Sequence, residues 1–282
     1  MQIKDYLIRI GYEGEIQPNI SCLKGIHRCH AMSVPYENLD VQLERPLDQN
    51  VERIFDKIVI SRRGGWCYEQ NGLLGWALRE IGFDVTRVVG AMARRERGDI
   101  TLGNHLVLLV HLDKTYMADL GVGDGCRAPL PLIEGTHQQG DLVFRLERIK
   151  DGYWRFHNHS FGIPKTFDFN QESANEELIA NTSHKLQINP DSIFVQNFIA
   201  QIMKENSITC LTGKIMKIKT SKGTTKTILA SAKELETTLT EVFGIKDPDI
   251  KLIWPKIQAR HAMLFGNQTL NQIKVSDQIL KN

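Results

Sequence analysis

The chain contains 282 residues, of which 41% are hydrophobic and 24% are charged, and its formal net charge is +2. These proportions are typical of an ordinary globular protein, and the near balance of charge gives no reason to expect a nucleic acid or a membrane surface as a partner. The N-terminal residues do not resemble a signal peptide, and no run approaches ~20 apolar residues, so we expect no membrane span.

The cysteines are five in number and are scattered along the chain, at positions 22, 29, 67, 126 and 210. An odd number without C-x-x-C pairs argues against a disulfide framework or a zinc site. His157 and His159 alternate on an expected strand, but no third metal ligand follows at a suitable spacing. We therefore predict a cytoplasmic protein with reduced thiols and no metal.

Residues 1–83 are expected to form a helical unit, because apolar residues recur there at helical spacing. Gly11 and Gly82 follow the first and the last of these stripes, as glycine commonly does at the end of a helix. The expected helices cover Ile3–Ile10, Leu23–His30, Val51–Ile58 and Cys67–Ile81.

Residues 84–189 change to the alternating pattern of strands. Asp113-Lys114 and Asp151-Gly152 mark two tight turns between successive runs. This spacing predicts a small antiparallel barrel. Its expected strands are Val85–Ala93, His105–Leu112, Thr115–Val122, Asp141–Ile149 and Tyr153–Phe161.

Residues 190–282 show a mixed pattern. A helix is expected from about Asp191 to Met203, and two short strands are expected on either side of residues 220–223. Ser231 and Glu234 have the spacing of a capping box for a helix that runs to Gly244. Lysines alternate with apolar residues between positions 214 and 226, which indicates a solvated strand face rather than a nucleic-acid site.

Cys67 stands where a cysteine should be reactive. It follows Arg63-Gly64-Gly65-Trp66, in which two glycines allow a sharp turn, and it begins the helical stripe that reaches Ile81. Free backbone N–H groups and the positive end of the helix dipole favour a thiolate at this place. The residue pattern therefore indicates a nucleophile.

His105 and Asp119 begin and end two strands that a tight turn joins. In an antiparallel hairpin the start of one strand lies beside the end of the next, so the two side chains should be neighbours. Together with Cys67 they supply a nucleophile, a base and an orienting carboxylate, which is the arrangement of a catalytic triad.

At these residues the sequence resembles the arylamine N-acetyltransferase family. The family signature Arg-Gly-Gly-x-Cys-x-Glu is matched by the segment from Arg63 to Glu69. Pro35-Tyr36-Glu37-Asn38-Leu39 resembles the Pro-Phe-Glu-Asn-Leu segment of the family, and the segments around His105 and Asp119 also correspond. The resemblance covers nearly the whole chain.

The resemblance implies an α+β fold with a cysteine-protease-like Cys-His-Asp core. Its three units would be an N-terminal helical bundle, a central antiparallel β-barrel and a C-terminal α/β lid. It also implies ping-pong transfer of an acetyl group from acetyl-CoA, through an acetyl-cysteine, to an arylamine, a hydrazine or an N-hydroxyarylamine. Oligomeric state is left open.

Further site residues follow from the same resemblance. Gly121, Gly123, Gly125 and Arg127 form a glycine-rich loop that would contact the pyrophosphate of CoA, since backbone N–H groups and one arginine can hold such a group. Tyr36 and Val122 would line the acceptor pocket, although the family usually has an aromatic residue where Val122 stands.

Two alternatives share the order Cys-His-Asp. One is an amide synthase, and the other is a transglutaminase-like hydrolase, which commonly has Trp after its cysteine, whereas Tyr68 follows here. A papain-like protease would have its histidine ~130–150 residues after the cysteine. The spacing of 38 residues from Cys67 to His105 excludes that version.

Overall fold

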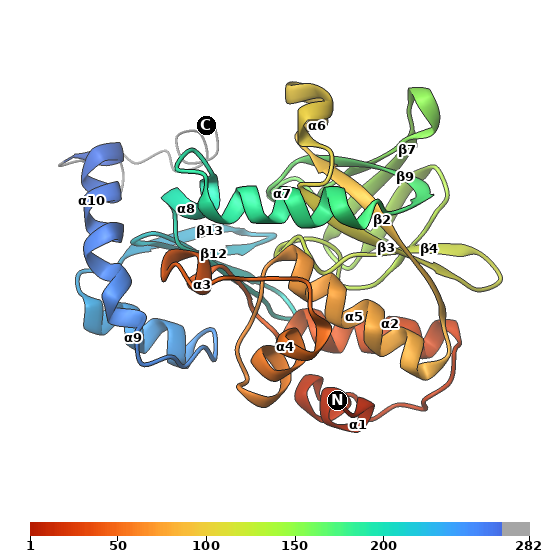
Figure 1. The fold of residues 1–282 in the computed structure, drawn as a ribbon, viewed down its shortest axis with the longest axis horizontal. Helices are drawn as coiled ribbons and strands as arrows, with labels where there is room; N and C mark the ends of the chain where they lie inside the picture. Colours follow the sequence, from red (N-terminus) through yellow and green to blue (C-terminus); the bar gives the residue numbers. More distant parts are fainter. Residues whose placement is uncertain (267–282) are drawn as a thin grey trace.

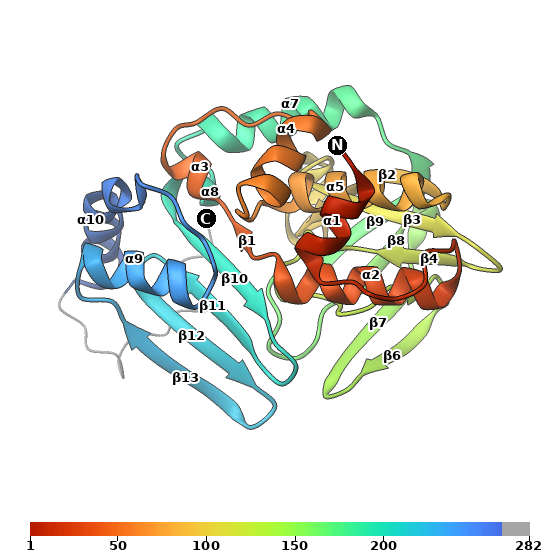
Figure 2. The same cartoon turned by 90° about the horizontal axis from the view of Figure 1, so that it is seen from below.

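The computed structural model describes residues 1–266, which form helices packed around two antiparallel sheets (Figures 1 and 2). The α+β fold class is therefore confirmed. Among these residues, no helix is both long and apolar enough to cross a bilayer.

The N-terminal part contains the four expected helical segments. Asn19 caps the second of them by accepting a hydrogen bond from the Cys22 N–H at 2.9 Å, and Gly11 and Gly82 end the first and the last with φ of 72° and 101°. The segment that begins at Val51 is helical as far as Ile60, but after Phe55 its α-helix passes into a π-helical turn. The helices are α1 (Ile3–Ile10), α2 (Ile20–Ser33), α3 (Leu39–Gln42), α4 (Val51–Phe55) with the π turn Asp56–Ile60, and α5 (Cys67–Ile81).

Eight strands form the central sheet in the order β5-β4-β3-β2-β9-β8-β7-β6, and each neighbouring pair is antiparallel. Aromatic residues of β7, β8 and β9 fill its inner face, including Phe144, Phe156 and Phe167. The strands are β2 (Asp84–Met92), β3 (His105–His111), β4 (Thr115–Ala118), β5 (Leu130–Pro131), β6 (Gly135–Gln139), β7 (Leu142–Arg148), β8 (Trp154–His157) and β9 (Thr166–Ser173).

Some predicted bounds in this part are wrong. β4 ends at Ala118, so Asp119 to Val122 leave the ladder instead of continuing the strand. β8 likewise ends at His157 rather than near Phe161. Three strands, β5, β6 and β9, and helix α7 (Glu176–Ile188) were not predicted. The start of α7 has a signal in the sequence, since Asn175 caps it by accepting from the Leu178 N–H at 3.0 Å.

The second sheet has the order β1-β10-β11-β12-β13 and is covered by α9 and α10 (Figure 2). Its first strand comes from the N-terminal part of the chain, because Tyr36 pairs with Gln201. Its elements are β1 (Tyr36–Glu37), β10 (Ile199–Met203), β11 (Ile208–Thr212), β12 (Ile215–Thr220), β13 (Gly223–Ile228), α9 (Ala232–Glu241) and α10 (Trp254–Phe265), with a 3-10 turn at Ile250–Ile253.

The expected helix from Asp191 to Met203 is wrong. Only the short helix α8 (Ile193–Gln196) forms, and the chain then becomes strand β10. The spacing of Phe194, Phe198 and Ile202 fits one helix face, but pairing on both sides, with β1 and β11, holds this segment extended. The expected strands beside residues 220–223 are confirmed as β12 and β13. Ser231 caps α9, whereas Glu234 accepts from the Ala230 N–H instead of closing a capping box.

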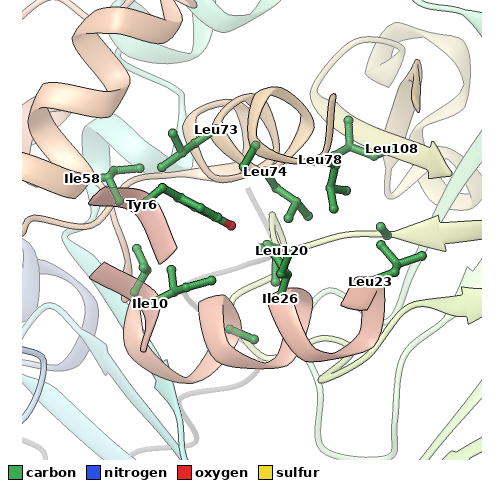
Figure 3. Packing of buried hydrophobic residues seen from close by; sticks show 14 of the residues in the cluster. Tyr6, Ile10, Leu23, Ile26, Ile58, Leu73, Leu74, Leu78, Leu108 and Leu120 are labelled. Atoms are coloured by element: carbon green, nitrogen blue, oxygen red, sulfur yellow. The ribbon is translucent and has the colours of Figure 1, made fainter. Parts of the chain in front are cut away.

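One hydrophobic core joins parts of the chain that are distant in sequence. Tyr6, Leu23 and Leu74 come from three helices and pack with Leu108 of β3 and with Leu120 (Figure 3). Residues of β10 and β11 also belong to this core. The division into units at 1–83, 84–189 and 190–282 stays a prediction, since this core crosses both boundaries.

A buried ion pair ties the second sheet to the first. Lys219 of β12 lies 2.8 Å from Asp124, which stands in the loop after β4, and the two side chains are 7% and 0% exposed. Asp124 also accepts from the Ile163 N–H, at 3.0 Å. Because the pair is buried, removing one charge leaves the other without compensation in a medium of low polarity.

We expect Lys219→Met to lower the free energy of unfolding by about 3–5 kcal/mol, because it leaves the buried Asp124 carboxylate without its counter-charge. Urea denaturation measures this loss. Lys222→Met serves as the control, since Lys222 is exposed in the neighbouring turn and its loss should stay within about 0.5 kcal/mol. Equal effects of the two substitutions would show that the ion pair does not tie the sheets together.

Candidate active site

Cys67 is the first residue of α5, as the sequence predicted. The turn before it needs its two glycines. A Cβ on Gly64 would lie 2.1 Å from the Pro35 carbonyl oxygen, and a Cβ on Gly65 would lie 2.8 Å from Cβ of Glu69. These close approaches bring the nucleophile against the segment that precedes β1.

Buried charges fix this turn. Arg63 donates to Oε1 of Glu37 through Nη2 at 2.8 Å and to Asp247 through Nη1 at 2.7 Å. Lys57 bridges Glu69 at 2.9 Å and Asp40 at 2.6 Å. Arg63 and Glu37, which stand in the two separate motifs before Cys67, are therefore paired, and these ion pairs hold the turn in place.

The imidazole of His105 and the carboxylate of Asp119 are in contact. Nε2 of His105 lies 3.0 Å from Oδ2 of Asp119, and the two side chains are 0% and 3% exposed. The expectation that they are neighbours is confirmed, although Asp119 lies beyond the end of β4. Nδ1 of His105 is buried and has no hydrogen-bond partner among residues 1–266. It is therefore free to take a proton from another group.

Gly121 marks the place where the nucleophile and the base meet. A Cβ at this position would lie 2.7 Å from Cβ of Cys67 and 2.7 Å from Cε1 of His105. The two atoms therefore lie no farther apart than twice that distance. Cε1 is bonded to both ring nitrogens, and because Asp119 engages Nε2, Nδ1 is the nitrogen that stays available to Cys67.

Burial has the largest effect on the charge state of Cys67. Burial raises the pKa of the Cys67 thiol, and the Asp119 carboxylate raises it further, whereas the backbone N–H groups of Tyr68 and Cys67 lower it. The helix start thus favours the thiolate as predicted, but burial outweighs it. Burial therefore disfavours an isolated thiolate at this position, whereas a thiolate paired with an imidazolium at His105 would be compensated in charge.

Asp119 is suited to stabilise that imidazolium. Burial raises the pKa of its carboxyl group, but the charge of His105 and hydrogen bonds from His105, Asn71 and Gly121 outweigh burial and lower it. Oδ1 accepts from Nδ2 of Asn71 at 2.7 Å and from the Gly121 N–H at 2.8 Å. The carboxylate is therefore ionised and fixed in direction.

Two residues of this site were not predicted from the sequence. Asn71 lies one helical turn after Cys67, and this spacing is a signal that could have identified it. His27 of α2 accepts a hydrogen bond at Nε2 from the Asp119 N–H at 3.3 Å. Burial lowers the pKa of His27 to about 4, so it is a neutral acceptor. No local pattern in the sequence connects His27 with Asp119.

The two expected acceptor residues lie together. Tyr36 and Val122 line one small enclosed space with Gly123 and Gln201. Tyr36 belongs to the hydrophobic cluster that contains Cys67, whereas Val122 also packs in the core of the central sheet. Of the two residues, Tyr36 is therefore the one that packs in the same cluster as the nucleophile.

The glycine-rich loop differs from an open cradle of N–H groups. The Gly121 N–H donates to Asp119, and the Gly125 N–H donates to the Val122 carbonyl at 2.8 Å. A Cβ on Gly123 would lie 2.1 Å from Oε1 of Gln201. At least two of the three N–H groups expected to hold a pyrophosphate are therefore already engaged.

Arg127 is separate from these glycines and lines a cavity of about 220 Å³ with Arg28 and Lys219. It is 8% exposed, its Nη2 donates to the Lys204 carbonyl at 3.1 Å, and its Nε has no partner among residues 1–266. Arg9, at 7% exposed, differs because it donates to three carbonyl oxygens. Arg127 thus has a buried N–H group that is available to donate a hydrogen bond to an anion.

The two histidines considered as metal ligands have other partners. His157 lies 2.8 Å from Oε2 of Glu147, and Nε2 of His159 lies 2.7 Å from the Asp124 carbonyl oxygen. Across the described part of the chain, no three His, Cys, Asp or Glu side chains gather in a way that could hold a metal ion.

Comparisons with known proteins agree with one family. A family model described as N-acetyltransferase matches residues 19–250. A pineal gland arylamine N-acetyltransferase of Gallus gallus is 33% identical, over 87% of this chain and 94% of the relative. An arylamine N-acetyltransferase of Mycolicibacterium smegmatis is 31% identical, over 93% of this chain and 98% of the relative.

Solved structures give the same result. The arylamine N-acetyltransferase of Mycobacterium tuberculosis aligns with a TM-score of 0.83 at 29% identity, over 91% of this chain and 99% of the other. A Mycobacterium marinum arylamine N-acetyltransferase in complex with CoA aligns with a TM-score of 0.81 at 28% identity, over 92% and 98%. With its Cys-His-Asp constellation on this fold, the chain belongs to the arylamine N-acetyltransferase family.

Proposed function

We propose that this protein transfers an acetyl group from acetyl-CoA to the nitrogen of an arylamine, a hydrazine or an N-hydroxyarylamine. The convergence of Cys67, His105 and Asp119 in one buried site carries the proposal. Its relatives are named arylamine N-acetyltransferases, and one related structure contains CoA. The five thiols are free, which supports the proposal of a reducing compartment such as the cytoplasm.

The reaction proceeds in two halves on one cysteine. The Cys67 proton moves to Nδ1 of His105, and the thiolate attacks the thioester carbon of acetyl-CoA. The carbon–sulfur bond to CoA breaks, the imidazolium returns the proton to the CoA sulfur, and the acetyl group stays on Cys67. An amine nitrogen then attacks this acetyl-cysteine and gives its proton to His105, and the Cys67 thiolate leaves.

Several contacts support these proposed roles. Asp119 holds Nε2 of His105, so that Nδ1 faces the thiol and the cationic ring is favoured. The backbone N–H groups of Cys67 and Tyr68 lie at the N-terminus of α5. There they can donate hydrogen bonds to the oxyanion that develops on the acyl group. Burial of the site strengthens these interactions, because the surroundings are less polar than water.

Arg127 is the residue that we propose for an anionic group of CoA. Its buried Nε lacks a partner among the described residues, and the adjacent cavity has room for a phosphate group. Gly121, by contrast, is proposed to allow the close approach of Cys67 and His105, because it has no side chain between them. Gly123 and Gly125 are proposed to keep the loop compact. Tyr36 and Val122 are proposed to bound the acceptor.

The covalent step is tested with Cys67→Ser. We expect this variant to lose acetyl transfer by at least about 1000-fold, because a hydroxyl at this site does not ionise in place of the thiol. Mass spectrometry of the wild type mixed with acetyl-CoA should find one acetyl group, on the Cys67 peptide. Continued release of free CoA without an amine, beyond one equivalent per enzyme, would favour a hydrolase, and substantial activity of the serine variant would contradict the covalent route.

Arg127→Met is expected to raise KM for acetyl-CoA by about 10-fold or more, because a charge-assisted hydrogen bond to phosphate is lost. Steady-state kinetics with p-nitrophenyl acetate, a donor without phosphate, supply the comparison, and there KM should change less than twofold. Arg9→Met is unsuitable as a control because Arg9 supports the Cys67 turn, so Arg28→Met, on the rim of the same cavity, is measured beside it. A parallel rise with both donors would remove Arg127 from the CoA site.

Val122→Ala tests the acceptor boundary. The smaller side chain enlarges the space beside Tyr36, so the ratio of kcat/KM for a bulky arylamine over aniline should rise by about tenfold. Val107→Ala is the matched control, since Val107 is equally buried in the same core. If both variants change every acceptor by one common factor, Val122 acts only through the core.

A further inference from the structure

Asn71 connects all three elements that carry the proposed triad. It is 0% exposed and lies on α5, the helix that begins at Cys67. Its Nδ2 donates to the Leu106 carbonyl oxygen at 2.6 Å and to Oδ1 of Asp119 at 2.7 Å, and its Oδ1 accepts from the Leu120 N–H at 2.8 Å. Leu106 follows His105, and Leu120 follows Asp119.

The three partners determine how the amide is oriented. A carbonyl oxygen and a carboxylate can only accept, so the NH₂ group of Asn71 must face them, and the N–H of Leu120 requires the amide oxygen. No aliphatic or acidic side chain of this size can donate twice and accept once. Only an asparagine side chain fits this position in both shape and hydrogen bonding.

We propose that Asn71 is a positioning residue, which holds the Asp119 carboxylate against His105 and fixes β3 and the β4–β5 loop to the helix of the nucleophile. The inference rests on the proposed triad. Asn71 itself acts through Asp119. Asn71 and the Gly121 N–H both donate to Oδ1 of Asp119, and Oδ2 of the same carboxylate is thereby directed at Nε2 of His105.

Without Asn71, the Asp119 carboxylate would lose a donor inside a buried site. Burial raises the pKa of Asp119, and the hydrogen bond from Asn71 is among the interactions that lower it. Its removal therefore raises this pKa, so the acid limb of the activity profile should move to higher pH. The other titratable groups that bear on Asp119 come from five different segments and are His105, His27, Cys67, Tyr36 and Cys126.

The test compares three substitutions at this position. Asn71→Asp keeps the shape but replaces the donors with a second acidic group beside Asp119, Asn71→Leu removes every hydrogen bond, and Asn71→Ser keeps one short hydroxyl. Asn38→Leu is the matched control, because Asn38 is 1% exposed and also makes three hydrogen bonds to backbone groups, none of them in the triad. Urea denaturation of each variant measures what burial alone contributes.

The main readout is the rate at which iodoacetamide alkylates Cys67, followed by mass spectrometry of its peptide from pH 5 to 9. We expect the rate at pH 7 to fall by about 10- to 100-fold in Asn71→Leu and by more in Asn71→Asp, with the acid limb moved to higher pH. Asn71→Ser should recover part of the rate. Asn38→Leu should lose stability but change the rate by less than about twofold per folded molecule.

Alkylation needs neither acetyl-CoA nor an amine, so it reports on Asn71 even if the proposed acetyl transfer fails. Loss of alkylation in Asn71→Asp with retention in Asn38→Leu supports the positioning role. An unchanged pH profile in all three Asn71 variants would overturn it, as would an equal loss in the control. If Asn71→Leu does not fold, the serine and aspartate variants decide between these outcomes.

Discussion

The buried contact of Arg63 with Glu37 and Asp247 is the interaction on which the rest of the site depends. It joins the turn before the nucleophile, the β1 segment and a residue of the C-terminal part through one guanidinium group. A planar group with five fixed donors can serve partners from different directions, which a lysine in its place could not. Since these side chains are almost fully buried, loss of Arg63 would leave the Glu37 carboxylate without its ion-pair partner.

This network also neutralises the carboxylates near Cys67. The carboxylates of Glu37, Asp40 and Glu69 are held in ion pairs by Arg63 and Lys57. In the proposed reaction, the imidazole of His105 supplies the counter-charge of the thiolate. A buried thiol that ionises only together with its base stays protonated and unreactive in all other arrangements, which protects it from chance oxidation.

The nucleophile was readable from the sequence because its causes are local. Two glycines, a cysteine and a helical stripe define the start of α5, and a short hairpin brings His105 near Asp119. Their catalytic roles remain predictions, but their proximity is confirmed. The prediction of a helix from Asp191 to Met203 was wrong. The apolar spacing of this segment fits a helix, but strands β1 and β11 pair with it on both sides and hold part of it extended.

Other features depended on three-dimensional burial. The pKa of Cys67 is governed by how completely the site excludes water, which no spacing reveals, and so the predicted advantage of the helix start was outweighed. The glycine-rich loop looked like a cradle for phosphate, yet its N–H groups at Gly121 and Gly125 serve the site itself. His27 contacts Asp119 across 92 residues of sequence.

The pairing of β1 with β10 sets an order on how the molecule can be assembled. Tyr36 and Gln201 are partners although 165 residues separate them, so this contact closes one of the longest loops in the chain. Closing such a loop is entropically costly and slow compared with local helix formation. During synthesis the helix that carries Cys67 can form early, but the segment beside it gains its strand partner only after most of the chain has left the ribosome. The nascent protein therefore passes most of its synthesis with an incomplete, inactive centre.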